Sequence, residues 1–140
     1  MAKLFAPFTN WQNISEIYLL RNLSRGKGVG FFEAGNFHPD FILWLVQGSR
    51  QKIAFIDPKG ILRLHGLNDP KIMFHQKVKD MEKRLGDKDV AMYSFIISNS
   101  WLADVKWWSG GDILEFSKRN VFFQKEEKDI YVQKIISGMC

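Results

Sequence analysis

The sequence predicts an α/β domain in which a mixed β-sheet is flanked by helices. Two segments, 40–46 and 90–98, are apolar on both alternating faces, as strands inside a covered sheet are. Between them, residues 69–85 carry apolar side chains at helical spacing. Strands that alternate with helices along a chain are typical of the α/β class.

Length and composition indicate one domain over residues 1–140, with 1–15 a poorly defined N-terminal segment. The chain is 46% hydrophobic and 25% charged, close to the average of globular proteins, which excludes a disordered or low-complexity chain. Its formal net charge of +5 is compatible with a polyanionic partner such as DNA.

The first half of the chain is expected to form strands. Residues 16–22 are rich in β-forming side chains, and residues 24–30 hold three glycines and two cations, which is typical of a basic loop. Segments 40–46 and 51–57 are separated by a short turn, so we expect them to pair as a hairpin.

A helix over 69–85 follows. Asp69 suits the N-cap, Pro70 suits the first helical position, and Gly86 suits the residue that ends the helix. Its expected buried stripe consists of Phe74, Val78, Met81 and Leu85. The later elements are expected to be a strand at 90–98, a short helix at 111–118, a strand at 120–124 and an amphipathic helix at 129–137.

No segment suggests a membrane or a secreted protein. The longest apolar run, 41–46, is far shorter than a bilayer span, and the N-terminus lacks the apolar stretch of a signal peptide. Cys140, the one cysteine, cannot form a disulfide within the chain, and no cysteine cluster is present for zinc. We therefore expect a cytoplasmic protein without membrane association.

Charged residues are expected to meet at one edge of the hairpin. Asp57 and Lys59 are two residues apart, so their side chains leave the same face of the strand, together with Ile53 and Phe55. Asp40 begins the neighbouring strand, and a hairpin places the start of one strand beside the end of the other. Asp40 and Asp57 should therefore lie together, with the apolar side chains excluding water.

Two carboxylates and a lysine are what metal-assisted hydrolysis of a phosphodiester needs. Carboxylate oxygens bind Mg²⁺, with Mn²⁺ as the alternative, and the metal makes hydroxide accessible. A lysine can position the attacking water or stabilise the pentacovalent phosphate. The tripeptide Asp-Pro-Lys occurs twice, at 57–59 and 69–71, but only the first ends a buried strand.

The pattern His38-Pro39-Asp40, then Asp57-Pro58-Lys59, resembles the PD-(D/E)xK nuclease superfamily. Residues 19–61 resemble the C-terminal nuclease region of helicases of the DEAD/DEAH type that serve as type III restriction subunits. This resemblance implies a restriction-endonuclease-like core. It also implies that Asp40 and Asp57 are metal ligands, that Pro58 contributes its backbone carbonyl, and that Lys59 is the catalytic lysine.

The chain departs from that family at its beginning. The superfamily core opens with a helix that often carries a glutamate facing the metal, and residues 1–15 contain no acidic residue. The first helix is therefore expected to be shortened or missing. No Walker A motif is present, so the chain resembles a detached or truncated part of a helicase–nuclease.

Two functions remain open at this level. The first is a Mg²⁺-dependent DNA endonuclease domain of the restriction type, with Arg25 and Lys27 of the basic loop contacting DNA phosphates. The second is a catalytically silent module with the same fold that binds DNA or a helicase partner. Beyond DNA, the resemblance implies a DEAD/DEAH helicase polypeptide or a methyltransferase subunit as the protein partner.

Overall fold

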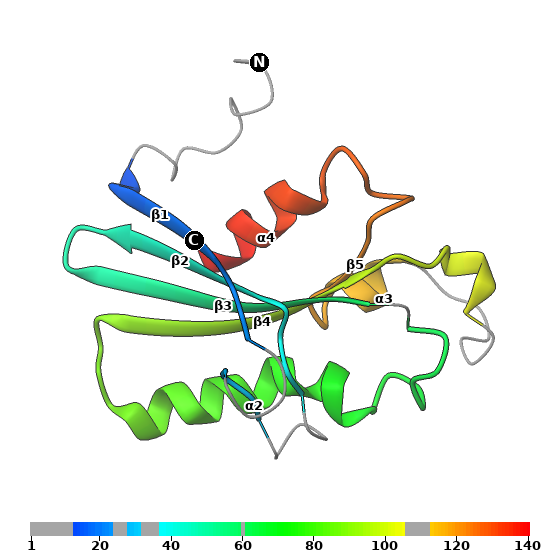
Figure 1. Ribbon diagram of the computed structural model, residues 1–140, viewed down its shortest axis with the longest axis horizontal. Coiled ribbons are helices and arrows are strands. Elements are labelled where there is room, and N and C mark those ends of the chain that lie inside the picture. Colours follow the sequence, from blue (N-terminus) through cyan, green and yellow to red (C-terminus); the bar gives the residue numbers. More distant parts are fainter. Residues whose placement is uncertain (1–12, 24–27, 32–36, 60, 106–112) are drawn as a thin grey trace.

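The computed structural model describes residues 13–23, 28–31, 37–59, 61–105 and 113–140, and these form an α/β structure with a five-stranded mixed sheet (Figure 1). Its elements are β1 (Glu16–Arg21), β2 (Phe41–Gln47), β3 (Arg50–Lys59), α2 (Pro70–Leu85), β4 (Val90–Ser98), the 3₁₀ turn η3 (Leu102–Asp104), α3 (Ile113–Ser117), β5 (Val121–Phe123) and α4 (Tyr131–Met139). The expected order of strands and helices is confirmed. The expectation about a first helix concerns residues outside the described ranges.

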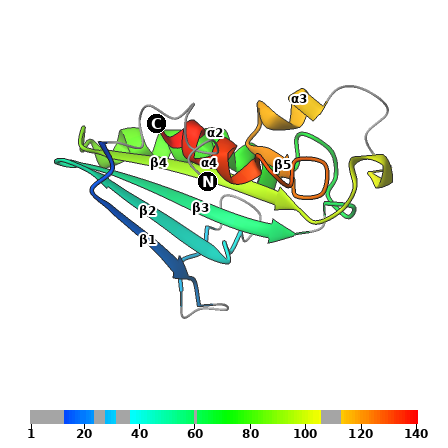
Figure 2. The ribbon, with the colours of Figure 1, turned by 90° about the horizontal axis from the view of Figure 1, so that it is seen from above.

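The strands are arranged in the order β1-β2-β3-β4-β5. β1, β2 and β3 pair antiparallel, whereas β4 lies parallel to β3 and β5 lies parallel to β4. A parallel neighbour requires a crossover, and α2 provides it between β3 and β4. The three segments expected at the centre of the sheet, β2, β3 and β4, each have a strand on both sides. β1 forms one edge of the sheet and lies farthest from the helices (Figure 2).

The two faces of the sheet are covered by different helices, α2 on one and α4 on the other (Figure 1). On the α2 side, the core nearest the hairpin contains Phe37, Phe55, Phe74 and Val78. On the α4 side, the core includes Leu43, Leu45, Ala54, Ile56, Phe95, Ile97, Ile135 and Met139. Because side chains alternate along a strand, every second residue of β3 faces α2.

Helix α2 begins and ends where the sequence predicts. The Asp69 side chain accepts a hydrogen bond from the Lys71 backbone N–H at 2.9 Å, and Gly86 ends the helix with a left-handed φ of 70°. The buried stripe is wrong at one position, because Leu85 is 57% exposed. Glu82 already bonds the Met92 backbone near the start of β4, so Leu85 lies beyond the packed part of the sheet.

Among the described residues, no helix has both the length and the apolar character that a bilayer crossing requires. Cys140 is exposed and has a free thiol.

Candidate active site

Asp57 lies near the end of β3 with its side chain on the face that α2 covers. Alternation places it on the same side as Phe55, which packs in the α2 core. The residue is only 4% exposed. Its Oδ2 atom is fully buried and accepts no hydrogen bond of standard geometry from the described part of the chain. A buried carboxylate oxygen without donors is unusual and calls for a functional explanation.

Lys59 contacts this carboxylate directly. Its ammonium group forms an ion pair with Asp57 Oδ2, as expected for side chains that leave one face of a strand. The same ammonium lies 5.6 Å from the centroid of the buried Phe37 ring. The Lys59 carbonyl accepts a hydrogen bond from the Asn99 backbone at 3.2 Å, which holds the end of β3 to the segment after β4.

Asp40 stands directly before β2, on the side of the hairpin where β3 ends. Phe41 pairs with Ile56, so the antiparallel register places Asp40 across from Asp57. In agreement with this register, the negative charge of Asp40 raises the pKa of the Asp57 carboxyl. Asp40 is exposed whereas Asp57 is buried. The structure therefore brings Asp40, Asp57 and Lys59 together at one edge of the sheet.

Asn22 holds the backbone beside Asp40, and this residue was not foreseen from the sequence. Its backbone N–H donates to the Asp40 carbonyl at 2.8 Å, and its side-chain amide donates to the Pro39 carbonyl at 2.8 Å. The same side chain bonds both the N–H and the carbonyl of Val29. An asparagine just after a strand is a signal for such backbone bonding, but its distant partners are not readable from the sequence.

Two glycines allow this close packing. A Cβ atom at Gly28 would lie 2.1 Å from the Leu23 carbonyl oxygen, and one at Gly30 would lie 2.4 Å from the His38 ring. The glycine-rich loop that the sequence predicts therefore has a steric role beside Asp40. Arg25 and Lys27, its expected DNA contacts, lie outside the described residues.

Burial raises the pKa of Asp57 above its ordinary value. The neighbouring Asp40 charge raises it further, because two like charges oppose ionisation. The Lys59 ammonium lowers this pKa through its ion pair, and Lys71 lowers it to a smaller extent, but the net shift is upward. The Lys59 ion pair therefore offsets only part of the cost of burying the ionised Asp57 carboxylate.

Lys71 is a second residue whose position near Asp57 and Lys59 the sequence did not predict. It belongs to the first turn of α2, and burial together with the nearby Lys59 ammonium lowers its pKa. Asp57 and Asp69 act in the opposite direction. Its position in the second Asp-Pro-Lys tripeptide was visible in the sequence, but its proximity to the first depends on how α2 crosses the sheet.

The residues present suit a hard divalent cation in part. A buried carboxylate oxygen without a hydrogen bond, next to a second carboxylate, is the donor chemistry that Mg²⁺ prefers, with water completing its coordination. The described residues contain no group of three acidic, histidine or cysteine side chains arranged for a metal. The Pro58 side chain lines an apolar cavity on the α4 side, and the metal-binding role of its carbonyl stays a prediction.

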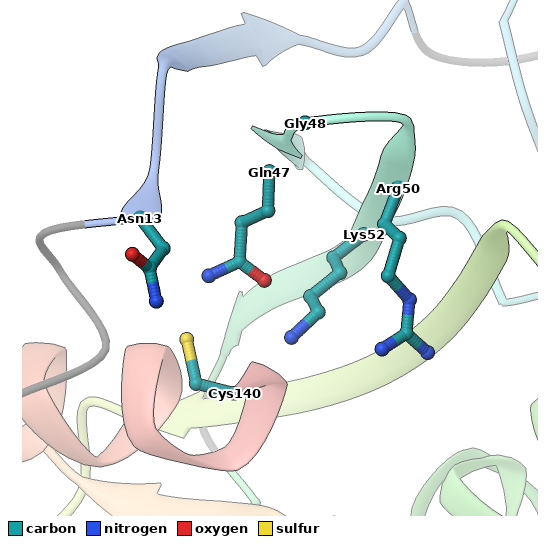
Figure 3. A pocket seen from close by; sticks show the side chains of 6 residues that line it. All are labelled: Asn13, Gln47, Gly48, Arg50, Lys52 and Cys140. Carbon is teal, nitrogen blue, oxygen red and sulfur yellow. The ribbon is translucent and has the colours of Figure 1, made fainter.

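A polar cavity of about 490 Å³ lies at the opposite end of the hairpin and is unrelated to these residues. Figure 3 shows its lining residues, Asn13, Gln47, Gly48, Arg50, Lys52 and Cys140. Lys52 faces α4, the opposite side of the sheet from Asp57, and the cavity adjoins the C-terminal end of that helix. Carbonyl groups at a helix C-terminus attract cations, which explains Arg50 and Lys52 without a ligand.

Comparisons of the chain with family models, curated proteins and solved structures give no match. Functional inference therefore depends on the site itself.

Proposed function

We propose that the protein is a metal-dependent DNA endonuclease domain with a restriction-endonuclease-like core. The observation that carries the proposal is the buried Asp57 carboxylate, which lies across the hairpin from Asp40 and beside Lys59. Burial makes the ionised form of Asp57 costly even with the Lys59 ion pair, so its position beside two further charged groups favours a catalytic role.

The resemblance to PD-(D/E)xK nucleases supports the same assignment. The acidic pair lies on two hairpin strands, the lysine follows two residues after the second acid, and α2 with β4 comes next. This order agrees with the strand, hairpin, helix and strand succession that the resemblance implies.

Each residue has a distinct role in the proposed reaction. Asp40, Asp57 and the Pro58 carbonyl would hold Mg²⁺ or Mn²⁺, which would make hydroxide accessible and neutralise charge on the phosphate oxygens. Lys59, which pairs with Asp57 here, would use its ammonium to orient the attacking water or to stabilise the pentacovalent phosphate. Ile53 and Phe55 restrict the access of bulk water from the α2 side.

One observation favours a silent DNA-binding or helicase-binding module as the second candidate. Within the described ranges only two carboxylates, Asp40 and Asp57, meet at the site, and Lys59 already neutralises one of them. Such a module would bind DNA, a helicase polypeptide or a methyltransferase subunit without cutting.

Plasmid cleavage separates the two candidates. Supercoiled DNA is incubated with the protein in Mg²⁺, in Mn²⁺ and in EDTA, alongside the Asp57→Asn variant. The nuclease proposal predicts nicking or linearisation by the wild type with either metal, and none with EDTA or with the variant. Intact plasmid in both metals, with the protein folded and binding DNA, would favour the silent module.

A further inference from the structure

A cavity of about 280 Å³ lies at the start of α2, and most of its polar side chains are basic. Its lining residues are Arg63, Leu64, His65, Asp69, Pro70 and Lys71. Arg63 and His65 are exposed, and within the described part of the chain neither side chain forms an ion pair with a carboxylate. The cavity is therefore accessible to an incoming anion.

Asp69 does not neutralise this cavity by ion pairing. One of its carboxylate oxygens accepts the Lys71 backbone N–H at 2.9 Å, and the other accepts the His65 backbone N–H at 3.0 Å. Both oxygens are thus occupied in holding the loop at 63–65 against the start of α2. Because the cap also uses the Lys71 N–H, the basic side chains, rather than the helix end, make the cavity suitable for an anion.

Lys71 connects the cavity to the candidate active site. It lines the cavity, and its ammonium interacts with the Lys59 ammonium and with the Asp57 carboxylate. Two ammonium groups repel one another, and an anion bound beside them relieves that repulsion. Lys71 therefore belongs both to the cavity with Arg63 and to the surroundings of Lys59 and Asp57.

We propose that Arg63, His65 and Lys71 form a subsite for a backbone phosphate of nucleic acid, next to the phosphate that would be cleaved at the Asp40, Asp57 and Lys59 site. The inference rests on the proposed function for its substrate, because a polynucleotide strand presents a second phosphate beside the one being cleaved. Arg63 and Lys71 contact the phosphate oxygens, and His65 donates a hydrogen bond from its ring.

Binding of a short DNA duplex in EDTA tests the subsite without cleavage. The Arg63→Ala/Lys71→Ala pair is compared with Lys83→Ala/Lys88→Ala, which removes two exposed cations from the far end of α2 and the loop after it. The subsite variant should bind about tenfold more weakly. The slope of its log binding constant against log salt concentration should decrease by about one, which corresponds to the loss of one phosphate contact. The control should lose less than about threefold, since it changes only the net charge.

Equal losses in the two variants, or wild-type binding by the subsite variant, would overturn the subsite. If the alanine variant does not fold, Arg63→Gln/Lys71→Gln replaces it, because glutamine keeps most of the side-chain packing. Inorganic phosphate provides a second probe. It should shift the His65 ring resonance of the wild type, and an unmoved resonance contradicts the proposal.

The plasmid assay keeps this inference separable from the proposed function. Weakened duplex binding by the subsite variant, with no cleavage by the wild type, would support the subsite and overturn the nuclease. Metal-dependent cleavage by the wild type, with unchanged binding by the subsite variant, would support the nuclease and overturn the subsite.

Discussion

The two Asp-Pro-Lys tripeptides of this chain have the same sequence and opposite structural roles. Asp57 and Asp69 are almost equally buried, at 4% and 6% exposed. Both oxygens of Asp69 accept backbone hydrogen bonds, and its proline starts a helix. Asp57 Oδ2 accepts none of standard geometry, and its proline lies within a paired strand.

Under the proposed function, this difference separates a structural carboxylate, Asp69, from a functional one, Asp57. A buried carboxylate with both oxygens bonded to backbone N–H groups stabilises the fold, whereas one whose burial outweighs its single ion pair destabilises it in the ionised form. Burial alone does not distinguish Asp57 from Asp69, and neither does the local sequence. What distinguishes them is the set of groups that each carboxylate meets in the folded chain.

The largest expected effect is the loss of cleavage in Asp57→Asn. Asparagine keeps the shape of the side chain but removes the charge that binds the cation, so Mg²⁺-dependent cleavage should fall by at least about a hundredfold. Rates of plasmid linearisation at saturating Mg²⁺ measure this. A cleavage rate within a few-fold of the wild-type rate would mean that Asp57 is not a catalytic metal ligand.

Lys59→Ala should reduce cleavage by about a hundredfold or more while metal binding is kept. A protonated lysine has no lone pair to offer a cation, and its removal frees Asp57 Oδ2. Calorimetric titration with Mg²⁺ alongside the cleavage assay separates the two effects. Loss of metal binding together with cleavage would contradict the role assigned to Lys59.

Metal affinity should depend on pH through Asp57. Because the pKa of this carboxyl is raised, protons compete with the cation at a higher pH than at an ordinary carboxylate. Below the raised pKa, affinity for Mg²⁺ should fall by about tenfold for each pH unit. Titrations from pH 8 downward measure this, and an affinity that stays constant to pH 4 would show that Asp57 does not bind the metal.

The smallest expected effect on cleavage is that of Asp69→Asn, the matched control in the second tripeptide. Asparagine caps a helix about as well as aspartate does, so α2 and the nearby Lys71 should stay in place. The cleavage rate should remain within about threefold of the wild type. A loss as large as that of Asp57→Asn, in a folded variant, would mean that the two tripeptides are not functionally different.

The α/β class and the order of strands and helices were largely predictable because their signals are local. The strands β2 and β4 are apolar on both faces, and α2 has its cap, its proline and its terminal glycine at the expected positions. The exposed Leu85 was not predictable, because spacing along a helix does not show where the sheet beneath it ends.

The site was predictable only where strand geometry determines it. Alternation placed Asp57 and Lys59 on one face, and hairpin pairing placed Asp40 across from Asp57. The positions of Asn22 and Lys71 could not be read in the same way. Asn22 bonds residues 7 and 17 positions away, and Lys71 meets Lys59 only through the path of the crossover helix.

Unfolding free energies of Asp57→Asn and Asp69→Asn, measured by urea titration in EDTA at pH 7, test this contrast most directly. With the pKa of Asp57 raised, stability falls as pH rises from the ordinary value of 3.8 through the raised one, so ionised Asp57 destabilises the wild type at pH 7. Asp57→Asn should therefore be more stable than the wild type by about 1 kcal/mol. Asp69→Asn should be less stable by about 1 kcal/mol, because one backbone N–H loses its acceptor. If both variants were destabilised by similar amounts, Asp57 would stabilise the fold as Asp69 does, which would contradict the role assigned to Asp57.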